Sequence, residues 1–297
     1  MIGPSAHQAG SRGPRKLSAA LLLALVWAAS GLLASGCGAS STIDPVAQAA
    51  TASASTPGYK MRLSMRLSSP ALTAFTASGS GSFDVRDHSG SFAMTIDLGN
   101  QPHVVQALGR STLQIEEIIK GVTIYVKLPP AITSKLPSGA PWLKIDLAKA
   151  GVPGLSSLAG TPASSDPSQM LQYLRAAGDV SNRGTERING VPTNRYHATV
   201  SLDRVADALP ASARNAARRS IAALERVTHT HELPVDAWID GAHLVRRIQM
   251  SFKASAQGQT VDALTTIDIP EYGPQPAPVL PPADQVTDAS ALLGSTG

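Results

Sequence analysis

The sequence predicts an α+β protein, an antiparallel sheet of about ten strands accompanied by two to three helices. Apolar and polar residues alternate along most of the chain, as they do in strands with one buried and one solvated face. Turn-forming residues separate these segments, for example NGVP at 189–192 and DGAH at 240–243. Two other stretches carry apolar residues at helical spacing.

Residues 1–36 are predicted to be a secretory signal. Three basic residues and no acidic ones precede an uncharged apolar segment at 17–33, which is the layout of a signal peptide. Its removal takes away three of the 25 basic residues and none of the 21 acidic ones, so the net charge falls from +4 to +1. The basicity of the whole chain therefore gives no reason to expect nucleic-acid binding.

Cys37 is the only cysteine among 297 residues and follows directly on this signal. The preceding LASG at 33–36 resembles the small-residue box of bacterial lipoproteins, in which the thiol is lipidated and the chain is cut just before it. Lipidation is the preferred interpretation, and an ordinary cleaved signal or an uncleaved transmembrane anchor are the alternatives. We accordingly expect an extracytoplasmic protein that is anchored to the cell membrane through lipidated Cys37.

The remaining chain is expected to form a tether, one domain and a tail. Small and polar residues at 37–57 indicate a flexible tether. The domain at 58–272 contains the alternating segments, at 60–67, 92–98, 122–128, 143–147, 196–202, 235–239, 244–252 and 261–269. The proline-rich residues 273–297 indicate an extended or disordered tail, and whether it docks on the domain is left open.

Two helices are predicted within the domain. Asp166 and Pro167 suit the N-cap and first position of a helix that ends at Gly178. The second, at 211–227, has an apolar stripe and four arginines, for which a solvated face is preferred over contact with a membrane surface.

Signatures of catalysis are missing from the sequence. It contains no nucleophile elbow, phosphate loop, dinucleotide-binding glycine motif or zinc-protease motif. We therefore expect no enzymatic activity, no catalytic residues and no cofactor. His229 and His231 could share one face of a strand and hold a metal ion, but a solvated strand start is the preferred interpretation, so no metal site is predicted.

Four phrases together resemble a known family. They are IYVKLP at 124–129, PWLKIDL at 141–147, GTERINGVPTNRY at 184–196 and LPVDAWIDGAHLVRRIQMSF at 233–252. In this order, behind the lipoprotein box, they are similar to actinobacterial lipoproteins of the LppX/LprG type, relatives of the LolA-like lipoprotein carriers. The resemblance covers about residues 57–272 and implies a strongly curved antiparallel sheet, a half-barrel, whose concave face is covered by helices and encloses an apolar cavity.

The same resemblance implies a carrier that binds lipid or lipoglycan acyl chains and moves them across the cell envelope. Its expected cavity lining consists of inward strand and helix positions: Met65, Phe92, Met94, Ile96, Ile115, Ile124, Leu171, Leu174, Tyr196, Ile221, Leu224, Ile248 and Met250. Methionine suits an adaptable apolar surface, although composition alone favours an ordinary core.

Two other functions are kept as alternatives. The first is a regulatory or interaction lipoprotein that uses this fold to bind a protein or peptide of unknown identity, which predicts an exposed apolar patch or a free sheet edge. The second is an enzyme, for which zinc held by the two histidines would be the starting point.

Overall fold

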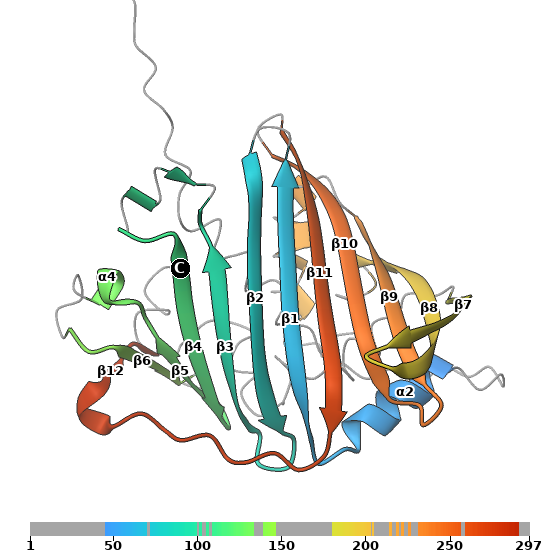
Figure 1. Cartoon of the computed structure of the whole chain (residues 1–297), viewed down its shortest axis with the longest axis horizontal. Coiled ribbons are helices and arrows are strands. Elements are labelled where there is room, and N and C mark those ends of the chain that lie inside the picture. Colours follow the sequence, from blue (N-terminus) through green and yellow to red (C-terminus); the bar gives the residue numbers. More distant parts are fainter. Residues whose placement is uncertain are drawn as a thin grey trace, which may run out of the picture.

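A single sheet of twelve strands organises the part of the chain that the structure, a computed structural model, describes (Figure 1). The strands are β1 (Gly58–Ser69), β2 (Leu72–Asp84), β3 (Ser89–Asp97), β4 (Thr112–Lys120), β5 (Thr123–Lys127), β6 (Trp142–Asp146), β7 (Ser181–Ile188), β8 (Val191–Ser201), β9 (Glu232–Asp240), β10 (Val245–Ala256), β11 (Gln259–Tyr272) and β12 (Val286–Asp288). The described residues are 45–69, 72–99, 101–102, 105–106, 109–133, 139–146, 180–202, 204, 214–215, 218–219, 221–222, 225–226, 231–256 and 259–290.

The strands follow the order β12-β6-β5-β4-β3-β2-β1-β11-β10-β9-β8-β7. Neighbours are antiparallel except for β12, which runs parallel to β6. The pairing of β1 with β11 joins the two halves of the chain at the centre of the sheet. The expected antiparallel half-barrel is thus observed as a large, open, curved sheet, with twelve strands in place of about ten, because the polar edge strand β7 and the short β12 show no apolar alternation.

Glycines in β2 allow an aromatic ring to lie flat on the sheet. Gly79 and Gly81 pair with Met94 and Phe92 of β3. A Cβ atom added at Gly79 would lie 2.6 Å from Cζ of Phe92, and one at Gly81 would lie 2.8 Å from its Cδ2. Both distances are too short for real contacts, so the ring occupies the space that larger side chains would need.

The described helices differ in number and position from the two to three that were expected to cover the concave face. Among the described residues, the only α-helix longer than one turn with defined bounds is α2 (Pro45–Ala54), and α4 (Pro130–Thr133) is a single turn. The helix predicted at 166–178 lies outside the described residues. Within the one predicted at 211–227, the described residues 214–215, 218–219, 221–222 and 225–226 are helical.

Helix α2 replaces part of the predicted flexible tether. Its buried residues, Val46, Ala49, Ala50 and Ser53, recur at helical spacing and pack into the core cluster beneath β8–β11. The hydroxyl of Ser53 accepts a hydrogen bond from the backbone N–H of Val245 at 3.3 Å. The prediction of a tether at 37–57 is therefore wrong for residues 45–54, whose small side chains fit closely against the ends of the strands.

Part of the C-terminal tail, whose docking the sequence left open, pairs with the sheet. A 3-10 turn, η1 (Ala283–Gln285), leads into β12, which pairs with β6 in the register Val286↔Trp142. The hydroxyl of Ser290 then accepts a hydrogen bond from the backbone N–H of Asp146 at 2.9 Å. Residues 286–290 thus cover an edge that β6 would otherwise expose.

Candidate functional site

The concave face of the sheet carries two adjacent rows of mainly apolar side chains. Because side chains alternate along each strand, residues paired across strands share a face. From β4 to β8 the first row is Ile115, Met94, Gly79, Leu63, Ile267, Ile248, Ala237 and Tyr196. The second is Leu113, Ile96, Ala77, Met65, Thr265, Met250, Val235 and Ala198.

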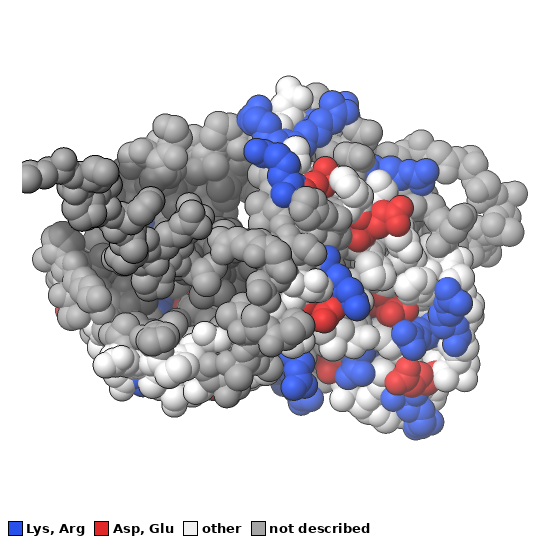
Figure 2. Space-filling view, turned by 90° about the horizontal axis from the view of Figure 1, so that it is seen from above, with Lys and Arg blue, Asp and Glu red and all other residues white. Residues whose placement is uncertain are grey.

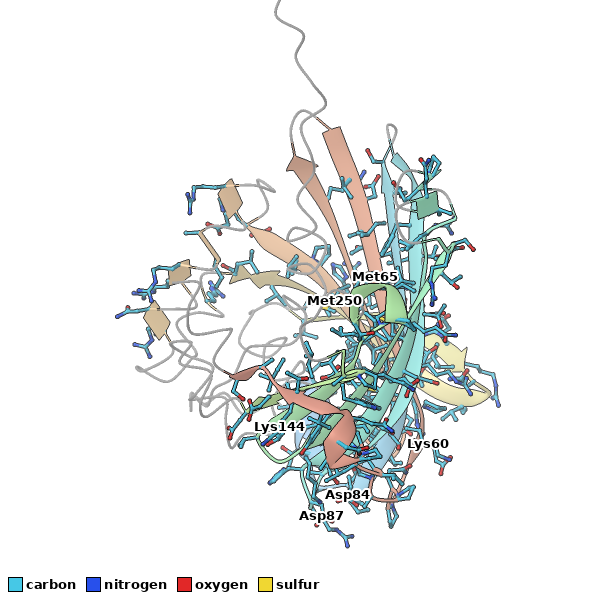
Figure 3. The ribbon with its side chains drawn as sticks, turned by 90° about the vertical axis from the view of Figure 1, so that its left-hand side faces the viewer. Lys60, Met65, Asp84, Asp87, Lys144 and Met250 are labelled. Atoms are coloured by element: carbon cyan, nitrogen blue, oxygen red, sulfur yellow. The ribbon has the colours of Figure 1, made fainter. Side chains whose placement is uncertain are left out.

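The two labelled methionines mark the middle of this face. Met65 and Met250 lie one strand apart, each paired with Thr265 of β11 between them. Figure 3 shows both on the hollow side of the curved sheet, whereas Lys60 lies on the opposite face. Both methionines are partly exposed, so their flexible side chains present apolar surface to the hollow.

Nine of the thirteen predicted lining residues belong to three clusters of apolar side chains. Met65, Phe92, Met94, Ile96 and Ile115 pack together with Ala77 and Leu98 on β1–β4. Tyr196, Ile248 and Met250 belong to the larger cluster that includes α2. Ile221 packs with Leu202 and Leu233.

Of the four remaining predicted lining residues, the structure describes only Ile124. Ile124 is buried on the same face, opposite Ile119, but outside the three clusters. Leu171, Leu174 and Leu224 carry no described side chain. Leu63 packs against both large clusters and joins them into one apolar surface.

Ile248 differs from the prediction in its exposure. Its side chain has no exposed surface, and it belongs to the buried cluster that includes α2. It therefore contributes to the core rather than to a ligand-accessible lining. The accessible part of the concave face begins with the partly exposed Met250 and Met65 in the second row.

A carboxyl group that sequence reasoning did not single out lies on the same face. Glu117 points to the same face of β4 as Leu113, Ile115 and Ile119. It is paired with Phe92 of β3. Burial raises the pKa of its carboxyl group. The signal was present in the sequence, since Glu117 interrupts an otherwise apolar every-second-residue pattern at 113–119.

The convex face of β8–β11 is polar and internally paired. Arg195 forms a bidentate ion pair with Asp236, at 3.0 and 3.2 Å, and Arg247 does the same with Asp268. These hydrogen bonds raise the pKa of each guanidinium. Both arginines lie over the ring of Trp238, and Figure 2 shows acidic and basic side chains side by side over this half of the molecule.

An open recess of about 860 Å³ lies elsewhere, near the far ends of β1, β10 and β11. It lies on the face opposite Met65 and Met250, because its lining residues Arg66, Leu264 and Ser251 pair across the strands and alternate with the methionines. It is therefore distinct from the apolar surface that the sequence predicts.

Of the two histidines considered as metal ligands, only His231 is among the described residues. Nδ1 of His231 lies 3.1 Å from the carboxylate of Glu225, and His229 is outside the described residues. In the described part of the chain, no three histidine, cysteine, aspartate or glutamate side chains gather as metal ligands would. Nor does any described helix combine the length and apolarity needed to span a bilayer.

Comparison with solved structures finds lipoproteins of the type that the sequence phrases resemble. LppX from Mycobacterium tuberculosis is 14% identical, with 79% of this chain and 96% of LppX covered at a TM-score of 0.40. LprF from Mycobacterium bovis is 12% identical, with 81% and 95% covered at 0.37. A LolA superfamily protein from Nitrosomonas europaea is 8% identical, with 79% and 93% covered at 0.28.

These structures are of the types, LppX and LolA, that the sequence phrases resemble. At such TM-scores and identities they assign no ligand or activity to this chain. No protein-family model and no curated protein sequence matches it. The function is therefore argued from the geometry of the concave face.

Proposed function

We propose that this protein is an extracytoplasmic lipoprotein, anchored through Cys37, that binds acyl chains of a lipid or lipoglycan on the concave face and carries them across the envelope. The observation that supports binding is the continuous pair of mainly apolar rows across β4–β8, with Met65 and Met250 partly exposed at its centre. A concave apolar face of this extent suits an elongated apolar ligand.

The driving force is removal of the acyl chain from water. Each methylene that leaves water contributes roughly 0.8 kcal/mol, so ten methylenes contribute about 8 kcal/mol before the entropy lost on binding is subtracted. No bond needs to be made or broken.

The test is mass spectrometry of organic extracts from protein purified without detergent. We expect co-purified acyl lipids, and we expect Met65→Asp and Met250→Asp to reduce them severalfold, because a carboxylate is poorly solvated against an acyl chain. Ser64→Asp and Ser251→Asp are matched controls, since these exposed residues neighbour the methionines on the same strands but point to the opposite face. Wild-type extracts without lipid, or equal losses in both pairs, would contradict the proposal.

Binding of a protein or peptide is a second candidate, favoured by the sheet edge at β7. Among the described strands, β7 pairs only with β8, and six of its eight residues are exposed. A strand of a partner could add there, although the register shift between Asn182 and Thr185 and the charge of Arg183 oppose regular pairing. Partners that are still captured by Met94→Asp and Met250→Asp variants would favour this candidate.

A further inference from the structure

Glu117 is an ionisable residue within the otherwise apolar part of the concave face on β3–β5. Its direct cross-strand partners are Phe92 on β3 and Val126 on β5. The nearest positions on the same face, one step along each strand, are Ile115, Ile119, Gly90, Met94 and Ile124. None of these side chains is charged or titratable, so nothing described on β3, β4 or β5 balances an ionised carboxylate.

The side chain is partly exposed and is nevertheless desolvated enough to raise its pKa. Its immediate surroundings on the sheet are the apolar positions of β3, β4 and β5 named above. Among the described residues, no donor lies within hydrogen-bonding distance of its carboxylate oxygens. A carboxylate in such surroundings is stabilised by any ligand that brings a hydrogen-bond donor to it.

The neighbouring glutamate shows the contrast. Glu116 points to the convex face, where its carboxylate accepts a hydrogen bond from Nζ of Lys127 at 2.8 Å. Two consecutive glutamates on one strand thus have opposite surroundings: Glu116 is paired at the surface, and Glu117 has no partner among the described residues and lies within the apolar concave face.

We propose that Glu117 binds the hydrogen-bond-donating group of an amphiphilic ligand, an ammonium or a hydroxyl, while the apolar part of that ligand lies along the side chains of β3 and β4. The proposal rests on the proposed acyl-binding function and adds to it the chemistry of the ligand's polar group. A donor at Glu117 compensates the carboxylate, and the apolar neighbours of Glu117 cover the first methylenes beyond the donor.

Three twelve-carbon probes with different head groups test this proposal: dodecylammonium, dodecyltrimethylammonium, which has the charge but no N–H donor, and dodecanoate. By isothermal titration calorimetry at pH 7.5, below the micellar concentration of each probe, we expect dodecylammonium to bind about tenfold more tightly than dodecyltrimethylammonium. Glu117→Gln should abolish this preference, and Glu116→Gln should retain it.

Proton release provides an independent readout. Dodecylammonium favours the ionised carboxylate, so binding should release protons from the wild type near the raised pKa of Glu117, measured as a dependence of the heat on the buffer. Glu117→Gln should show no such release.

The outcomes separate the two proposals. If none of the three probes binds the wild type, the acyl-binding function fails and the role of Glu117 fails with it. If the probes bind with affinities that do not depend on the head group or on Glu117, or if Glu116→Gln has the same effect as Glu117→Gln, only the role of Glu117 is overturned.

Discussion

Asp240 stabilises the turn between β9 and β10 through both of its carboxylate oxygens. Oδ1 accepts hydrogen bonds from the backbone N–H groups of Ala242 and Leu244, each at 2.9 Å, and Oδ2 accepts one from Nε of Arg246 at 2.6 Å. The side chain is buried, so its loss leaves these donors without a partner.

We expect Asp240→Ala to lower the free energy of unfolding by about 1–3 kcal/mol in urea denaturation, because three partly buried hydrogen bonds to this buried carboxylate are lost. Asp240→Asn should lose less, since its amide oxygen can still accept from Ala242 and Leu244. Equal losses in the two variants would mean that the turn amides gain nothing from this side chain.

Glu117 makes stability depend on pH. Burial raises its folded-state pKa above the unfolded value near 4.5, so its contribution is fully present below that value and is lost as the pH rises through the folded pKa. We expect Glu117→Gln to be more stable than the wild type at pH 8 and to lose this advantage at pH 4, measured by urea denaturation at both pH values. An advantage that does not change with pH would contradict the assignment.

At the scale of elements, α2 depends on small buried side chains. Val46 and Ala49 have no exposed surface, and truncation of Val46 removes two methyl groups from a packed site. We expect Val46→Ala to lower the free energy of unfolding by about 1.5–3 kcal/mol. Thr51→Ala, at an exposed position of the same helix, should change it by less than about 0.5 kcal/mol. Similar effects of both would show that α2 does not pack on the core.

Strand β12 protects the edge of β6. We expect removal of residues 286–297 to produce concentration-dependent association in size-exclusion chromatography with light scattering, because β6 then presents unpaired backbone groups. Removal of residues 291–297 is the matched control, since it keeps the pairing of β12 and the contact of Ser290 with Asp146. A monomeric protein after the longer deletion would exclude this role.

The sequence predicts those elements whose burial shows in their own residues. Strand β1 is recognisable because Met61, Leu63 and Met65 alternate with exposed residues. Helix α2 was missed because its buried stripe consists largely of alanine and serine, which pack closely only against a surface supplied by distant strands. Strand β12 was missed for a related reason, since its three residues are a strand only beside β6, more than 130 residues earlier.

The candidate site was predictable to a similar extent. Alternation alone assigns Met65, Met94 and Met250 to one face. It does not show that Ile248 is fully buried, because burial depends on the whole cluster, which includes a helix that the sequence did not predict. Alternation also predicts that Glu117 shares this face. That it has no partner among the described residues depends on the side chains that β3 and β5 place beside it.

At the scale of the whole molecule, the proposed anchor determines where the protein is found. We expect Cys37→Ser to move the domain from the membrane fraction to the medium or to leave an uncleaved precursor. Two acyl chains anchor a protein firmly, and the variant would carry none. Ser40→Ala, which keeps the cysteine, is the control. Cell fractionation and the mass of the intact protein measure both, and a Cys37→Ser protein that stays anchored after cleavage would contradict lipidation at this residue.

The early start of α2 sets the geometry of that attachment. With Cys37 in the bilayer surface, only residues 38–44 separate the lipid from Pro45, and seven residues span at most about 24 Å when fully extended. The helix packs where β1 begins and β11 ends, so the proposed anchor would keep these strand ends within reach of the headgroups. The opposite tips of β1 and β11 lie roughly 40 Å from these ends, given about 3.3 Å for each strand residue. A lipid at Cys37 would therefore tether the molecule by one end of its central strands.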